Sequence, residues 1–188
     1  LDRTRVRTRP LAERENRIRI EHDHVSPEDA PTKLSPQAKV ILEEVVARIR
    51  DAKSRERPVI IAFGAHTIKN GLGPVLAALM ERGWLTHLAT NGAGIIHDWE
   101  FSFLGQSSEH VAPNVADGSF GNWEETGRYI NLALVVGAYE GKGYGESVGA
   151  LIENEGLMLP EPATLEETIR GISGDLDRVA AAADLLDV

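Results

Sequence analysis

Residues 58–90 are predicted to form a strand, a helix and a second strand, and this order constrains the fold more than any other feature of the sequence. A short run rich in β-branched residues at 59–63 is typical of a buried parallel strand. The next stretch predicts a helix over 74–82, with a proline in its first turn and a glycine after its last residue. A second strand is predicted over 85–90. Such a βαβ unit binds ligands beyond the carboxyl ends of its strands.

The rest of the chain reads mainly as helices. Apolar residues recur at helical spacing from Val40 to Arg50, after a capping residue that is either Thr32 or Ser35. Further helical patterns cover 123–139, 144–153 and 165–186. Residues 17–21 are a weaker strand candidate, and we expect no further strand.

These elements predict an α/β fold in which a parallel sheet carries helices on both faces. An open sheet of this kind usually has about five or six strands, whereas this chain offers two strong ones. We therefore expect the sheet to be incomplete in this chain. We also expect the chain to be a piece of a longer protein, or one product of a processed protein.

Two segments of different composition divide the chain. Residues 1–36 are predicted to be a basic arm and a proline-rich linker, and residues 37–188 the α/β domain. The arm contains seven arginines, at positions 3, 5, 7, 9, 14, 17 and 19. It either binds an acidic partner or RNA, or packs against the acidic body of its own subunit or of a neighbour.

Charge and composition exclude several classes of protein. A net charge of −9 and a pI near 5.2 argue against a broad nucleic-acid-binding surface, which requires clustered positive charge. The chain has no cysteine, which excludes disulfides, thiolate metal sites and cysteine nucleophiles. No apolar run reaches the roughly 18 residues that a transmembrane helix needs, and the arginine-rich start is unlike a secretory signal. We expect a cytoplasmic protein that binds no membrane and has no broad nucleic-acid-binding surface, with the basic arm as the one local exception.

The segment after the first predicted strand is a candidate anion site. Gly64 ends that strand, and His66 and Lys69 follow it. Backbone N–H groups at the start of a helix can hold a phosphate or carboxylate there, and Lys69 adds a positive charge. The GxxxxGK[ST] and GxGxxG patterns are absent, so a tight turn with a surface lysine is the alternative.

The segment after the second predicted strand is a candidate cofactor site. Its four residues are Asn91, Gly92, Ala93 and Gly94. Their small size allows a dinucleotide to approach the backbone closely, although glycines also serve in turns that bind nothing.

Titratable residues follow this second segment. His97, Asp98 and Glu100, with His66 from the first segment, are candidates for acid/base chemistry or metal binding. We predict no metal site, because the HExxH and HxxxH patterns are absent. Alternatively, Asp98 and Glu100 simply favour the positive end of a helix that begins near His97.

Two polar segments further along are also candidates. Residues 106–109 are predicted to form a turn capped by a serine, in which Glu109 has no further role. No GxSxG pattern surrounds these serines, so neither is a predicted nucleophile. Asp117, Gly118 and Ser119 are typical of a turn, and their polar groups can also hold ribose hydroxyls or a cationic amine.

Three of these candidate segments carry motifs by which the chain resembles the deoxyhypusine-synthase-like family of NAD-binding, Rossmann-type domains. The motifs are GAHTIKNG after the first strand, TNGAGIIHDWE after the second, and ADGSFGN. The resemblance covers about half of the chain, from Val59 to about Ile152. It implies a parallel sheet with helices on both sides, assembly as a tetramer, and NAD lying across the strand ends at subunit boundaries.

The resemblance also implies roles for particular residues. Asn91, Gly92 and Ala93 would line the dinucleotide. Asp117, Gly118 and Ser119 would match the family's DGS segment, near the nicotinamide and the amine substrate. The imine-forming lysine of the synthase has no counterpart here, so we do not expect deoxyhypusine synthesis itself.

The leading interpretation is an NAD- or nucleotide-binding enzyme that acts on a small molecule and forms a homodimer or homotetramer. The residues expected nearest the chemistry are His66, Lys69, His97 and Asp98. One alternative is an isomerase or aldolase-type enzyme that uses Lys69 to bind a small anionic substrate without NAD. Another is a ligand-binding or assembly module without catalysis, since fold does not fix function.

Overall fold

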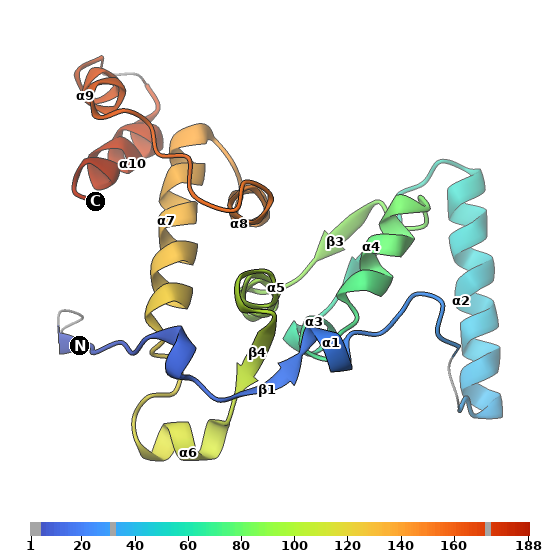
Figure 1. The fold of residues 1–188 in the computed structure, drawn as a ribbon. Coiled ribbons are helices and arrows are strands. Elements are labelled where there is room, and N and C mark those ends of the chain that lie inside the picture. Colours follow the sequence, from blue (N-terminus) through green and yellow to red (C-terminus); the bar gives the residue numbers. More distant parts are fainter. Residues whose placement is uncertain (1–4, 31–32, 172–173) are drawn as a thin grey trace. The chain divides into compact units, whose positions relative to one another are not determined.

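The computed structural model describes residues 5–30, 33–171 and 174–188 of the 188-residue chain. It is a mixed α/β structure, mostly helical, with two small two-stranded sheets in the described residues (Figure 1). The chain divides into two compact units, which are described separately below. Unit 1 contains Leu1–Arg17, Ser102–Leu104 and Glu109–Val188, and unit 2 contains Ile18–Phe101 and Gly105–Ser108.

Unit 2 contains the predicted βαβ unit. Strand β2 (Ile60–Ala62) pairs in parallel with β3 (His87–Ala89), with Ala62 opposite Ala89. Helix α4 (Gly73–Glu81) connects them, as predicted, and Leu76 on α4 is buried. A short helix, α3 (Ala65–Lys69), precedes α4 where the sequence suggested only irregular structure. The strand, helix and strand order is therefore confirmed, and the parallel pairing with it.

The prediction that these strands are buried is wrong. Ile60 on β2 is 62% exposed and Leu88 on β3 is 40% exposed. Within the described residues no third strand joins this pair, so no extended parallel sheet is shown. Val59, Ile61 and Phe63 of the predicted run pack against the core of unit 2 and are partly buried, so this small sheet is covered on one face only.

The predicted helix near residues 40–50 is α2 (Pro36–Ser54). The Oγ atom of Ser35 accepts a hydrogen bond of 3.1 Å from the backbone N–H of Ala38, so Ser35 is its N-cap. Thr32, the other capping candidate, lies outside the described residues. The core of unit 2 lies elsewhere and is formed by Ile68, Leu76, Leu85 and Phe101, with Ile18 and Ile20 packed against it.

The second small sheet pairs β1 (Asn16–Arg19) with β4 (Gln106–Glu109). β1 is the weaker strand candidate of the sequence, and the short helix α1 (Ile20–Asp23) follows it directly. β4 replaces the capped turn predicted at the same residues, so that prediction is wrong. The sequence of β4 is Gln-Ser-Ser-Glu, which has no apolar residue to indicate a strand.

Helix α5 (Gly92–Leu104) leads from β3 to β4, and α6 (Val111–Ala116) follows β4. Gly105 ends α5 in the left-handed conformation, with φ of 69°.

Four helices form most of unit 1. They are α7 (Glu124–Glu140), α8 (Tyr144–Glu153), α9 (Pro162–Arg170) and α10 (Leu176–Leu186). The first two match the predicted helices closely. The single helix predicted over 165–186 is instead two helices, which fold onto α7 and enclose a core that includes Tyr139, Leu165, Ala182 and Leu185. Asp175 caps the start of α10, accepting a hydrogen bond from the backbone N–H of Arg178.

Residues 5–17 of the basic arm are part of unit 1. Leu11, in the short 3₁₀ helix η2 (Leu11–Glu13), is buried, and its backbone N–H donates to Glu125. The Arg14 guanidinium lies 5.5 Å from the Trp123 ring centre. Arg3, another arginine of the arm, lies outside the described residues. In the described residues, no helix has both the length and the apolar character that a membrane span requires.

Candidate functional site

The loops that follow β2 and β3 begin at neighbouring positions of the sheet edge. Ala62 and Ala89 are paired, and the backbone N–H of Phe63 donates to the Ala89 carbonyl at 2.9 Å. Gly64 is the N-cap of α3 and Asn91 is the N-cap of α5. Two of the predicted segments therefore start side by side, because parallel strands end at the same edge.

Asn91 and Gly94 have structural roles in the start of α5. The Asn91 side chain accepts a hydrogen bond of 3.1 Å from the backbone N–H of Gly94. A Cβ atom at Gly94 would lie 2.4 Å from Oγ1 of Thr90, so only glycine fits without a shift. Gly92 and Ala93, between them, supply N–H groups at the first turn of the helix, where such groups have no partner within the helix.

The first segment has a different arrangement. Ile68 on α3 is buried in the core, and this anchors the short helix. His66 is exposed and Lys69 is half-buried, three residues apart and so on one side of α3. Gly64 has φ of −90°, and a Cβ atom added there would meet nothing within 4 Å, so its conformation does not require glycine.

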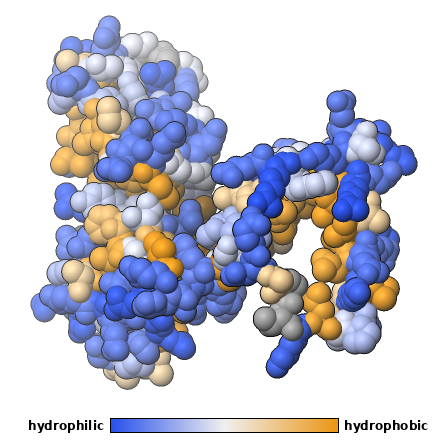
Figure 2. Space-filling model, turned by 45° about the vertical axis from the view of Figure 1, so that its right-hand side comes forward, coloured by the Kyte–Doolittle hydropathy of each residue, from blue (hydrophilic) through white to orange (hydrophobic). Residues whose placement is uncertain are grey.

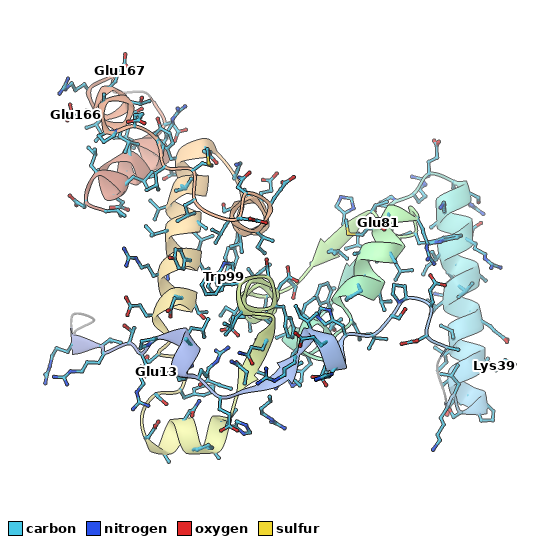
Figure 3. All side chains as sticks on the ribbon, viewed as in Figure 1. Glu13, Lys39, Glu81, Trp99, Glu166 and Glu167 are labelled. Atoms are coloured by element: carbon cyan, nitrogen blue, oxygen red, sulfur yellow. The ribbon has the colours of Figure 1, made fainter. Side chains whose placement is uncertain are left out.

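His97 is part of a buried hydrogen-bonded chain between α5 and β4. Its Nδ1 atom lies 2.7 Å from Oγ of Ser107, and that Oγ donates to Oε2 of Glu100 at 2.5 Å. Ser107 and Glu100 are both almost fully buried. Figure 3 shows the neighbouring Trp99 on α5, and Trp99 is also buried. His97 and Glu100 share one face of α5 because they are three residues apart.

The order of this chain determines the protonation of the imidazole. A serine hydroxyl has one proton, and Ser107 gives it to Glu100, so the hydrogen between His97 and Ser107 must come from Nδ1. A neutral His97 then carries its proton on Nδ1 and has an unprotonated Nε2.

This arrangement is not a nucleophilic triad. In a triad the histidine lies between the serine and the acid, whereas here the serine lies between the histidine and the acid. Ser107 is fully buried, which also keeps its hydroxyl from a substrate. Its neighbour Ser108 is buried with φ of +72°, an uncommon conformation for a residue other than glycine.

Asp98 has a separate environment on the next position of α5. Asp98 is exposed to solvent, yet the protein atoms around its carboxyl partly desolvate it and raise its pKa above the ordinary value. The charge of His24 acts in the opposite direction and lowers this pKa, with a smaller effect. His24 itself packs edge-on against the Phe101 ring, with ring centres 5.2 Å apart.

Asp117, Gly118 and Ser119 belong to unit 1 and form a self-contained turn. Oδ1 of Asp117 accepts hydrogen bonds from the backbone N–H and the hydroxyl of Ser119, at 3.0 and 2.6 Å. Oδ2 of Asp117 lies 3.2 Å from the Arg9 guanidinium. Gly118 has φ of +76°, which favours glycine. Both carboxylate oxygens already have partners within the chain, so the turn explains these residues without a ligand.

Glu109 has a role that the sequence did not indicate. Its Oε2 accepts hydrogen bonds from Asn114 at 2.7 Å and from the Trp123 indole at 3.0 Å. Its Oε1 accepts one from the backbone N–H of Gly121 at 3.0 Å. Glu109 therefore fixes the loop that contains the ADGSFGN motif, and the expectation that it has no role beyond a turn is wrong.

The structure shows hollows away from the predicted residues. One, of about 290 Å³, lies at the amino ends of β2 and β3 beside Arg57, Trp84 and His87. Another, of about 70 Å³, lies against α7 and α8 near Gly137 and Ser147. None of the predicted site residues lines either of them. Within the described residues, no group of three or more histidine or acidic side chains is placed to hold a metal ion.

Comparison of the chain with protein families, with curated proteins and with solved structures finds no match. The resemblance to deoxyhypusine-synthase-like domains therefore stays a prediction. The inferences about function below rest on the geometry of the chain itself.

Proposed function

We propose that this chain is an enzyme that binds NAD or another nucleotide where β2 and β3 end, and that His97 accepts a proton from the small molecule on which it acts. The observation that carries the proposal is the hydrogen-bonded chain from His97 through Ser107 to Glu100. An imidazole fixed in one tautomer by a buried carboxylate is the usual arrangement of a general base. The fold in this proposal is Rossmann-like, with the parallel pair as its visible part.

The start of α5 supports the binding part of the proposal. The N–H groups of Gly92 and Ala93 lie at the positive end of a thirteen-residue helix, directly after a parallel strand. His97 is five residues further along α5, which is roughly 8 Å along a helix axis. A phosphate at the helix start would thus leave the reacting part of a ligand within reach of His97.

The chemistry assigned to each group is simple. NAD, when bound, supplies an acceptor for hydride. His97 removes the proton from the hydroxyl or amine of the substrate. Glu100 stabilises the resulting imidazolium through Ser107, and Lys69 provides a positive charge for a phosphate or carboxylate. Asp117 and Ser119 belong to unit 1, where each is already engaged in its own turn, so they have no part in this proposal.

Ligand-dependent thermal stability tests the proposal. NAD, NADH, AMP and phosphate are titrated separately, and a ligand that binds the folded state raises the melting temperature by mass action. We expect NAD and AMP to stabilise the protein. Lys69→Met should need about ten times more ligand for the same rise in melting temperature, which corresponds to a loss of about 1.4 kcal/mol in binding free energy. Lys39→Met, at an exposed position of α2, is the matched control and should change nothing.

The other outcomes separate the alternatives. Stabilisation by phosphate but not by NAD or AMP would favour the enzyme that binds a small anionic substrate without NAD. If NAD binds and NADH appears on addition of alcohols or amines, His97→Gln should abolish turnover and leave binding intact. Binding without turnover in the wild type would favour the non-catalytic module. No response to any of these ligands would refute the proposal.

A further inference from the structure

Helix α2 exposes an unusual amount of apolar surface. None of its 19 residues is buried. Five large apolar residues are substantially exposed: Val40 at 64%, Ile41 at 55%, Leu42 at 46%, Val45 at 44% and Val46 at 37%. Figure 1 shows α2 as a long helix, and Figure 2 shows uncovered hydrophobic residues on the face that it draws. Burying such a side chain stabilises a protein by about 1.5–3 kcal/mol, so a covered α2 would be considerably more stable.

The apolar stripe of α2 has a particular symmetry. It consists of Ala38, Ile41, Val45, Ile49 and Ala52, which are separated by 3, 4, 4 and 3 residues. These spacings place all five on one face of a helix, on which Ile41 and Val45 are exposed and Ala38, Ile49 and Ala52 are partly buried. The series reads the same from either end, with a small residue at each end and Val45 at the centre. A helix with such a stripe can pack against an antiparallel copy of itself in regular layers.

We propose that α2 pairs antiparallel with α2 of a second copy of this chain, about a two-fold axis at Val45. Val45 then packs on Val45 of the second copy. Ile41 packs on Ile49 of the other helix, and Ala38 on Ala52. Each copy contributes the same surface, as a symmetric dimer requires.

The side chains that flank the stripe fit this pairing. Glu44 and Arg48 lie on one flank and form an ion pair within the helix. In the antiparallel dimer, Glu44 of each copy lies within one turn of Arg48 of the other, so opposite charges meet across the axis. Leu42 and Val46 lie on the other flank, where the four side chains from two copies form an apolar cluster. Charge and apolar surface are thus complementary on both sides of the stripe.

Single cysteines test this arrangement directly, because the natural chain has none. In Val45→Cys the two thiols lie near each other across the axis, and mild oxidation should give a covalent dimer on a non-reducing gel. Val40→Cys is the matched control, since Val40 is more exposed but lies on the opposite side of α2. We expect it to cross-link at least tenfold more slowly. Equal rates for the two variants would overturn the proposal.

The mass in solution gives a second measurement. Light scattering should find twice the 20.5 kDa chain mass at micromolar concentration. Val45→Lys should then yield a monomer with unchanged helix content by circular dichroism, whereas Val40→Lys should remain dimeric. A monomeric wild type, or a Val45→Lys variant that is still a dimer, would show that a second copy does not cover α2. These measurements require no nucleotide, so their outcome does not depend on the proposed enzyme activity.

Discussion

The Nδ1 atom of His97 lies 2.7 Å from the Oγ atom of Ser107, which is fully buried. This contact joins a residue of α5 to a residue of β4, and it extends to Glu100 through the serine hydroxyl. Because a buried carboxylate needs donors, the three side chains depend on one another for stability as well as for protonation.

Replacement of Ser107 by alanine should therefore destabilise the protein. It removes the donor to the buried Glu100 and the partner of His97 Nδ1, so we expect a loss of about 1–3 kcal/mol in the free energy of unfolding. Urea denaturation measures this loss. Ser102→Ala, at an exposed position of α5, is the control and should stay within about 0.5 kcal/mol of the wild type. Equal stability of the two variants would contradict the hydrogen-bonded chain.

Two glycines of the predicted cofactor segments should respond differently to alanine. In Gly94→Ala the new Cβ would lie 2.4 Å from Oγ1 of Thr90, and we expect a loss of about 1–3 kcal/mol in unfolding free energy. Gly64→Ala should cost little, because nothing lies within 4 Å of the added Cβ. Thr90→Ala should restore much of the stability lost in Gly94→Ala. A double variant no more stable than Gly94→Ala would show that the clash is not the cause.

Asp98 should make the protein less stable at neutral pH than it would be with asparagine there. Its pKa in the folded state is raised by burial, so the protonated carboxyl favours folding. That contribution is present below the unfolded pKa of about 3.9 and is lost as the pH rises through the folded pKa. Asp98→Asn should therefore be more stable than the wild type at pH near 7 and similar to it at pH near 3, in urea denaturation.

Asp117 should behave in the opposite way. Its pKa is lowered, first by the hydrogen bonds from Ser119 and to a smaller extent by Arg9. Its contribution to stability is present above the unfolded pKa of about 3.9 and is lost as the pH falls through the folded pKa. Asp117→Asn should thus be less stable than the wild type at neutral pH, with the difference disappearing in acid.

The cause of the Asp117 shift has its own test. Carboxyl resonances followed by NMR over pH should show a higher pKa for Asp117 in Ser119→Ala than in the wild type. Arg9→Ala should raise this pKa less. A larger effect from Arg9→Ala would mean that the ion pair, and not the turn, holds the carboxylate ionised.

Local pattern predicted much of this chain. The apolar run before Gly64 indicated β2, and the apolar residues at helical spacing after Ser35 indicated α2. Both patterns depend only on residues that are close together in the sequence. The parallel pairing of β2 with β3 could be predicted because a helix lies between the two strands in the sequence. Asn91 does follow the second strand, as predicted, but its role as the cap of α5 became visible only in the structure.

Contacts between distant residues decided the rest. β4 has no apolar alternation, so its strand conformation depends on pairing with β1, and Ser107 meets His97 only because of that strand. The Glu109 carboxylate likewise accepts hydrogen bonds from Asn114, Gly121 and Trp123, which only the folded chain brings together. The sequence by itself determined which segments of strong period form helices and strands, since those depend on near neighbours. Only the tertiary structure decided which polar side chains share a hydrogen bond and which apolar faces remain exposed, because both depend on where separate elements meet in space.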